Sequence, residues 1–171
     1  MLTHPLIRLL WCLIGASCGI GLALFLVGPP FTPLLLASLG GTTVFLFSLT
    51  RVPAAQPRAL LGGHFGSAFI GIACYQALGE SLAVYVLATS LTLAWMLLTR
   101  TVHPPAGANP VIMIHAHAGW SALWDPVLLG VGALMLVVIV WSRLYPGLAR
   151  YPVKPFAPSP PQLDWGGWRS S

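Results

Sequence analysis

The stretch Thr101-Val102-His103-Pro104-Pro105-Ala106-Gly107-Ala108-Asn109-Pro110 decides how this chain can fold. It lies between two apolar stretches that are long enough to cross a bilayer. Two adjacent prolines remove two backbone donors, and the residue before each proline is pushed toward extended geometry. A continuous helix is therefore not expected through residues 103–110. At membrane depth, broken backbone persists only where protein or a water-filled cavity satisfies its polar groups. We therefore expect the functional centre at this break.

The composition indicates a membrane protein. Of the 171 residues, 57% are hydrophobic and 6% are charged, and the mean hydropathy is +0.84. Soluble domains carry about 25% charged residues. The apolar runs do not alternate in polarity as the strands of a barrel would. We expect an all-α, polytopic membrane helix bundle with the lipid bilayer as its surroundings.

Six apolar segments follow one another along the chain, and we expect each of them to cross the membrane. They are residues 9–27, 32–50, 59–79, 81–99, the proline-broken stretch with its continuation 111–118, and 127–145. We divide the chain into a membrane domain of residues 1–150 and a tail, residues 151–171, which is rich in proline and aromatic residues. The tail is expected to lie along the surface. Gly15 and Gly19 have GxxxG spacing, which favours packing within the chain over an oligomer contact.

The charged residues predict the orientation of the six crossings. With the N-terminus inside, Glu80 and Asp125 fall on the outer side. All basic residues then fall on the inner side, as cytoplasmic loops require: Arg8, Arg51, Arg58, Arg100, Arg143, Arg150, Lys154 and Arg169. A re-entrant hairpin at the broken segment would export the basic tail, so we expect two cytoplasmic termini. The net charge of +5 is thus a topology signal, and no nucleic-acid partner is expected.

An internal repeat relates the two halves of the chain. Gly40-Gly41-Thr42-Thr43-Val44-Phe45 resembles Gly107-Ala108-Asn109-Pro110-Val111-Ile112, and each run lies in the middle segment of a trio. Three crossings per unit give the two units opposite orientations. Interrupted helices at matching positions of an inverted repeat indicate a transport site near the bilayer midplane. We therefore predict an inverted 3+3 repeat with two broken helices, which brings Thr42, Thr43 and Asn109 together.

Three sequence elements resemble the HPP family of integral membrane proteins. The first is Arg100 to Asn109, the second is Gln56-Pro57-Arg58 followed by Gly63-His64, and the third is Gly40 to Val44. The similarity extends from about Leu9 to Pro152, whereas the rest of the tail is unmatched. The chain departs from the family pattern at Ser38-Leu39, where members often have proline and phenylalanine. Family members in chloroplasts and cyanobacteria are described as nitrite transporters, so the resemblance implies nitrite as the candidate substrate.

The polar residues of the apolar segments fit an anion better than a cation. No Asp or Glu lies within these segments, whereas hard cations require oxygen ligands such as carboxylates. The N-termini of broken helices and the side chains of Thr42, Thr43 and Asn109 offer hydrogen-bond donors. We expect these residues to bind the substrate: Gly40, Gly41, Thr42, Thr43, His103, Gly107, Ala108 and Asn109.

A second set of residues is expected to couple protons or to form the inner mouth: His64, Arg58, Arg100 and Gln56. Alternatives remain open for each role. His64 can instead make an interhelical hydrogen bond, His103 can cap freed carbonyls, and the two arginines can act only as topology signals.

The expected function is a membrane transporter or channel for a small inorganic anion, and the choice between carrier and channel stays open. The alternative is a structural or regulatory membrane subunit without transport activity. No catalytic constellation, metal cluster or cofactor motif is evident, so no enzyme activity, metal or cofactor is expected. A bundle of six crossings is thin, and we expect it to form a homo-oligomer. The expected location is the inner membrane of a bacterium.

Overall fold

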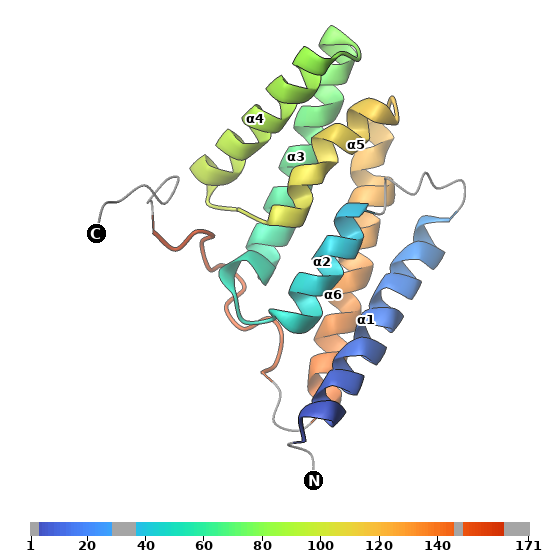
Figure 1. Ribbon diagram of the computed structural model, residues 1–171, viewed down its shortest axis with the longest axis vertical. Helices are drawn as coiled ribbons and strands as arrows, with labels where there is room; N and C mark the ends of the chain where they lie inside the picture. The colour runs from blue at the N-terminus through green and yellow to red at the C-terminus, as the bar shows by residue number, and fades with distance from the viewer. Residues whose placement is uncertain (1–3, 29–36, 146–148, 163–171) are drawn as a thin grey trace.

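The computed structural model describes residues 4–28, 37–145 and 149–162, and this part of the chain is helical (Figure 1). Its α-helices are α1 (Pro5–Val27), α2 (Ala37–Ser48), α3 (Pro57–Leu78), α4 (Leu82–Thr99), α5 (Asn109–His115) and α6 (Leu129–Leu144). The short turns are the 3-10 turns η2 (Pro53–Ala55), η3 (Pro104–Ala108) and η4 (Trp120–Leu123), and the π turn η5 (Trp124–Leu128). The described residues form no β-strand, only an isolated bridge between Thr101 and Ser159. The expected all-α class is confirmed.

Within the described residues, three helical stretches are long and apolar enough to cross a membrane: Pro5–Val27, Leu82–Thr99 and Trp120–Leu144. Large apolar side chains remain exposed on them, including Phe25 at 80% and Leu82 at 79%. Such surfaces suit contact with lipid chains. Two other helices are short, because the 12 residues of α2 and the seven of α5 rise only about 18 Å and about 10 Å at 1.5 Å per residue.

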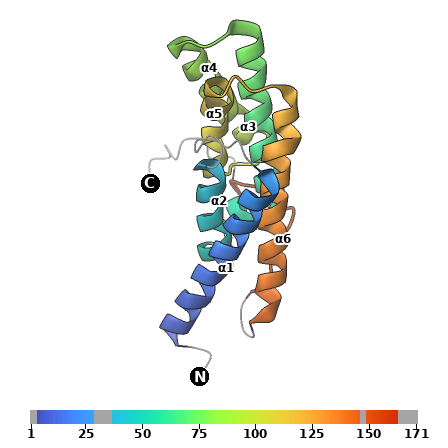
Figure 2. The ribbon, with the colours of Figure 1, turned by 90° about the vertical axis from the view of Figure 1, so that its right-hand side faces the viewer.

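Successive helices run in opposite directions along the long axis of the molecule (Figure 1). They pack in two groups. The first group comprises α1, α2 and α6, and its core includes Leu46, Leu134 and Val138. The second group comprises α3, α4 and α5, and its cores include Ile72, Met113 and Ile114. Figures 1 and 2 show the second group displaced along the long axis from the first. Each group therefore combines two longer helices with one short helix.

The glycines of α1 mediate packing inside the chain, as expected. Gly15 and Gly19 are buried on the side of α1 that faces α6 and α2. A Cβ added at Gly15 would collide with the Trp141 ring, and one added at Gly19 would lie 3.0 Å from Phe47. These glycines allow the close approach of aromatic side chains from the neighbouring helices.

The prediction of two broken helices is wrong for the first segment. Gly40, Gly41, Thr42 and Thr43 all lie inside the regular helix α2. The residues before this helix, 29–36, lie outside the described part of the chain. Both threonine hydroxyls bond carbonyl oxygens one turn back, at 2.8 and 2.9 Å, which is compatible with a continuous helix. The cost of about 1 kcal/mol per glycine is too small to interrupt a packed helix.

The prediction of a break at residues 103–110 is confirmed. Helix α4 ends at Thr99, and the next residue, Arg100, adopts a left-handed conformation with φ 55°. His103 is extended, as expected for a residue before proline, and η3 follows it. Regular α-helix resumes only at Asn109.

Candidate functional site

A face of small residues on α3 receives the broken segment. Gly63, Ser67 and Gly71 recur at four-residue intervals and are buried. A Cβ at Gly63 would lie 3.0 Å from the Thr101 carbonyl oxygen and 3.1 Å from the His103 Cβ. At Gly71 it would lie 2.6 Å from the Pro110 Cα. The small residues therefore let the broken backbone lie directly against α3, where protein covers it.

On its opposite side the broken segment contacts α2. A Cβ added at Gly41 would lie 3.0 Å from the Pro105 Cβ, whereas one added at Gly40 would meet nothing within 4 Å. Gly41 therefore allows η3 to approach the helix, and this contact brings the two halves of the predicted repeat together.

A cluster of five polar side chains fills the space between α2, α3 and the broken segment. We call Thr42, His64, Ser67, His103 and Asn109 the polar cluster. Each of them is at most 1% exposed. Because α2 belongs to the first group of helices and the other residues to the second group and its broken segment, the polar cluster lies where the two groups meet.

The Thr42 hydroxyl is the centre of the polar cluster. Its Oγ1 lies 2.8 Å from His64 Nε2 and 2.9 Å from His103 Nε2. His103 Nδ1 lies 2.7 Å from the carbonyl oxygen of Ala54. Asn109 Nδ2 lies 3.1 Å from His64 Nδ1. Four segments of the chain are thus connected by one series of hydrogen bonds.

These contacts assign the tautomers of both imidazoles. A carbonyl oxygen only accepts, so His103 Nδ1 carries its proton and Nε2 accepts. The Asn109 amide donates to His64 Nδ1, so the His64 proton is on Nε2 and is donated to Thr42. The Thr42 proton then lies within reach of two acceptors, His103 Nε2 and the Ser38 carbonyl oxygen at 2.8 Å. The hydrogen bonds therefore run in one direction, from Asn109 through His64 and Thr42 to His103.

No carboxylate takes part in the polar cluster. Glu80 lies instead in the turn between α3 and α4 and contacts the far end of the broken segment, where His117 Nε2 is 2.7 Å from its carboxylate. The Tyr85 hydroxyl donates a hydrogen bond of 2.6 Å to the same carboxylate. The hydrogen bond from Tyr85, followed by that from His117, lowers the pKa of Glu80. Among the described residues, no group of three or more His, Cys, Asp or Glu side chains could hold a metal ion.

The structure brings together three of the eight predicted substrate-binding residues, Thr42, His103 and Asn109, and adds His64 from the second predicted set. Thr43 is buried but bonds only within its own helix. Gly41 contacts Pro105, whereas Gly40 and Gly107 face open space. Ala108 packs partly buried against the core of the second group. Thr42 and Asn109 thus both take part in the polar cluster, whereas the Thr43 hydroxyl bonds the Leu39 carbonyl of its own helix.

Three residues predicted at the inner mouth, Gln56, Arg58 and Arg100, make hydrogen bonds to the tail. Gln56 Oε1 accepts from the backbone N–H groups of Val153 and Lys154, each at 3.0 Å. The Arg58 backbone N–H donates to Pro155, and its guanidinium donates to the Thr99 carbonyl at 2.9 Å. The Arg100 guanidinium donates to the carbonyls of two tail prolines. The described part of the tail is therefore a strap with specific hydrogen bonds.

Ser159 fastens this strap to the start of the broken segment. Val102 N–H donates to the Ser159 carbonyl at 2.8 Å, and Ser159 N–H donates to the Arg100 carbonyl at 2.9 Å. The Ser159 hydroxyl also donates to the Val102 carbonyl at 2.7 Å. Tyr151 is fully buried, and its hydroxyl donates to Ala55. Burial raises the pKa of this tyrosine.

Sequence reasoning missed Ser67, Ser159 and the Ala54 carbonyl. A signal for Ser67 was present, because Gly63, Ser67 and Gly71 repeat a small residue every four positions. No comparable signal marked Ser159, since its role depends on where the tail returns.

The fold and the polar cluster define a helical membrane protein with a buried, uncharged hydrogen-bonded centre. The family described as "HPP, transmembrane region" matches residues 2–152, and the chain belongs to this family.

Two proteins of Dictyostelium discoideum, each named as a transmembrane protein, are similar to the chain. One is 32% identical over 114 residues, which cover 62% of this chain and 40% of the relative. The other is 30% identical over 130 residues, which cover 71% of this chain and 42% of the relative. The aligned part of the chain thus spans about two fifths of each of these relatives. No solved structure matches the chain.

Proposed function

We propose that this protein is a membrane transporter for a small inorganic anion, with nitrite as the leading candidate. The observation that carries the proposal is the polar cluster, which combines hydrogen-bond donors with two imidazoles and contains no carboxylate. Ionisable side chains buried in membrane helices are costly and mark transport paths. The cluster side chains are at most 1% exposed, so the anion enters only after a rearrangement, which favours a carrier over an open channel.

The packing of the helices supports an inverted 3+3 repeat. If α1, α2 and α3 correspond to α4, α5 and α6, the first group of helices maps onto the second. The neighbours α1–α6, α1–α2 and α2–α6 then map onto α4–α3, α4–α5 and α5–α3, and all six pairs are in contact. Transport sites of inverted repeats lie at the interface between the repeats. The polar cluster joins Thr42, His64 and Ser67 of the first repeat to His103 and Asn109 of the second, so it lies at such an interface.

The hydrogen bonds from His64 through Thr42 to His103 can act as a proton relay, and this relay provides a physical reason for proton coupling. If His64 takes up a proton on Nδ1, it can pass its Nε2 proton to Thr42 while Thr42 passes its own proton to His103 Nε2. His64 is then neutral with its proton on Nδ1, and His103 is an imidazolium. A positive imidazolium neutralises a bound monovalent anion, so a proton and the anion cross together without net charge.

Anion flux through the purified protein in liposomes tests the proposal. We expect nitrite uptake that is faster than in empty vesicles and that increases when the outside is more acidic than the inside. His64→Ala removes the first imidazole of the relay, so we expect its remaining flux to lose this pH dependence. Nitrite and nitrate fluxes equal to those of empty vesicles would contradict the proposal, and an unchanged pH profile in His64→Ala would remove His64 from proton coupling.

A structural or regulatory membrane subunit is the second candidate. It is favoured by the complete burial of the cluster and by its satisfied hydrogen bonds, which also suit a purely structural connection between helices. A folded protein without anion flux would support this candidate.

We further propose six crossings with the basic end of the bundle in the cytoplasm, as the positive-inside rule requires. At this end Arg8 and Arg58 lie in the first turns of α1 and α3, and Arg51 follows α2, whereas Glu80 and Asp125 lie in connections at the other end. We also propose that the protein lies in a bacterial inner membrane and associates with copies of itself. We propose no enzymatic role. Labelling of single cysteines from each side of the membrane tests the orientation.

A further inference from the structure

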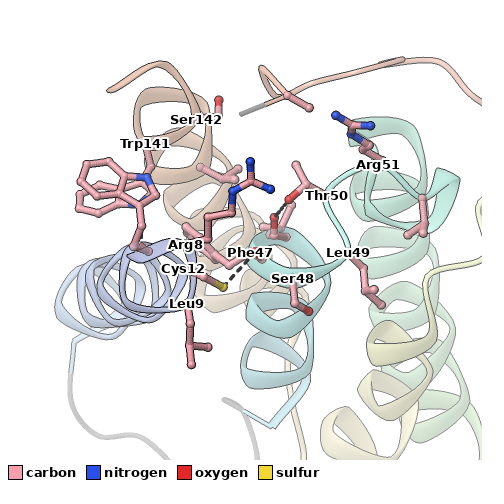
Figure 3. A pocket seen from close by; sticks show the side chains of 15 residues that line it. Arg8, Leu9, Cys12, Phe47, Ser48, Leu49, Thr50, Arg51, Trp141 and Ser142 are labelled. Carbon is pink, nitrogen blue, oxygen red and sulfur yellow. Dashed lines mark hydrogen bonds between the residues drawn. The ribbon is translucent and has the colours of Figure 1, made fainter. Parts of the chain in front are cut away.

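A cavity lies away from the polar cluster, in the first group of helices. It has a volume of about 550 Å³ and lies between the start of α1, the end of α2 and the end of α6 (Figure 3). None of the five cluster residues lines it. This cavity therefore requires an explanation of its own.

Two arginines flank the cavity and have no partner in the described part of the chain. Arg8 projects from α1, and Arg51 projects from the loop after α2 (Figure 3). Neither guanidinium makes a hydrogen bond or an ion pair with another described residue. Arg58 and Arg143, in contrast, donate to backbone carbonyls. Arg8 and Arg51 are therefore available to an anionic group at the cavity.

The wall of the cavity carries a buried donor without an acceptor. Trp11 Nε1 is shielded from solvent and has no hydrogen-bond partner. Its ring stacks on Trp141, with centroids 4.3 Å apart, and Trp141 itself donates to the Trp11 carbonyl. A buried N–H without a partner is unfavourable. Because this N–H is shielded, the Trp11 ring contributes to the cavity as part of its apolar wall.

The remainder of the lining is largely apolar and includes Leu9, Leu46 and Val138. The cavity thus combines a cationic rim with an apolar wall. A small inorganic anion would use only the rim, whereas a phospholipid would use both, with its phosphate at the arginines and its first methylene groups against the wall. Basic pockets between membrane helices on the cytoplasmic side suit anionic headgroups. The combination of a cationic rim and an apolar wall therefore favours an anionic amphiphile as the ligand.

We propose that this cavity binds an anionic phospholipid, with its phosphate between Arg8 and Arg51 and the start of its acyl chains against the apolar wall. The cavity adjoins α1, α2 and α6 together, so the lipid stabilises the packing of the first group. The proposal is independent of anion transport, because none of the cluster residues lines the cavity.

Native mass spectrometry of the purified full chain in detergent, with added phosphatidylglycerol or phosphatidylcholine, tests this site. We expect phosphatidylglycerol to bind at least about fivefold more tightly, since each basic residue adds about 1 kcal/mol to the attraction of an anionic lipid. Arg8→Gln with Arg51→Gln should abolish this preference. Lys154→Gln is the matched control, because Lys154 is also exposed and basic but does not line the cavity.

Equal binding of the two lipids, or an equal loss in Lys154→Gln, would overturn the proposal. Displacement of the lipid by millimolar inorganic phosphate would also overturn it, because the site would then take a free anion. If the double variant does not fold, the comparison of the two lipids and the phosphate competition in the unaltered protein still decide the question. Tryptophan fluorescence should shift on addition of phosphatidylglycerol, and the shift should be lost in Trp11→Phe.

Discussion

The paired-glycine run in α2 and the proline-rich run before α5 have similar sequences but different structures. Gly40 to Phe45 is a regular helix, whereas Gly107 to Ile112 spans the end of η3 and the start of α5. Proline removes a donor and imposes geometry, so its effect on the backbone is obligatory. Glycine only permits distortion, and here it permits close approach instead. The first run therefore leaves space beside Gly41, and Pro105 of the proline-rich run packs into that space.

The contact between Gly41 and Pro105 gives the largest expected effect. Gly41→Leu forces a side chain into space occupied by Pro105, and we expect a loss of about 1–3 kcal/mol in the free energy of unfolding. Gly40→Leu is the matched control, because it adds the same side chain one residue earlier into open space. Reversible unfolding in mixed detergent micelles measures both. Equal changes in the free energy of unfolding would show that the contact between Gly41 and Pro105 does not govern this region.

The amide of Asn109 is expected to have the next largest effect. Asn109 Nδ2 contacts His64 Nδ1, the His64 carbonyl and the Ser67 hydroxyl. Asn109→Leu keeps a similar volume but removes these hydrogen bonds, so we expect a loss of about 1–3 kcal/mol in the same unfolding assay. Gly107→Ala adds a methyl group to open space in the same segment and should change stability by less than about 0.5 kcal/mol. Equal free energies of unfolding for the two variants would contradict the stabilising role of the Asn109 hydrogen bonds.

The hydroxyl of Ser159 tests whether the tail holds the broken segment. Ser159→Ala removes its bond to the Val102 carbonyl but leaves both backbone bonds, so we expect a loss of about 1 kcal/mol. Hydrogen exchange should increase at the Val102 amide and remain unchanged in α2. An unaltered Val102 amide would contradict the role of the tail as a strap.

The smallest effect is expected at Glu80, which holds the far end of the broken segment through His117. Its pKa is lowered by hydrogen bonds from Tyr85 and His117, so its stabilising effect is present above the unfolded value of about 4.3 and is lost as pH falls through the lower folded value. Glu80→Gln should therefore lower the melting temperature slightly at about pH 6. The difference from the unaltered protein should shrink below about pH 4. A difference that persists at acid pH would exclude this electrostatic contribution.

Much of the fold could be predicted from the sequence. Composition and the lengths of the apolar runs predict membrane helices, and the adjacent prolines predict the break before Asn109, because these effects are local. The regular helix at Gly40 and Gly41 could not be predicted in the same way, since its stability depends on Pro105 from a distant part of the chain.

In the candidate site, too, local features could be predicted from the sequence, whereas contacts between distant segments could not. Thr42, His64, His103 and Asn109 could be selected as polar residues in apolar segments, yet their mutual hydrogen bonds depend on how three elements pack. Gln56 and Arg100 are predicted to couple protons or to form the inner mouth, and the structure shows in addition that both bond the tail. Their bonds to the tail were not foreseeable, since the tail lacks the periodicity that predicts a packed element.

Transport by two variants of Thr42 tests the central claim most directly, because this hydroxyl lies within hydrogen-bond distance of both His64 and His103. Thr42→Ser keeps the hydroxyl, whereas Thr42→Val has the same shape without it. In liposomes with an inward proton gradient, we predict nitrite uptake by Thr42→Ser within about threefold of the unaltered protein and a loss of at least about tenfold in Thr42→Val, as expected for a lost buried hydrogen bond of about 1–3 kcal/mol. Uptake by folded Thr42→Val that matches Thr42→Ser, with the same dependence on the proton gradient, would contradict the account.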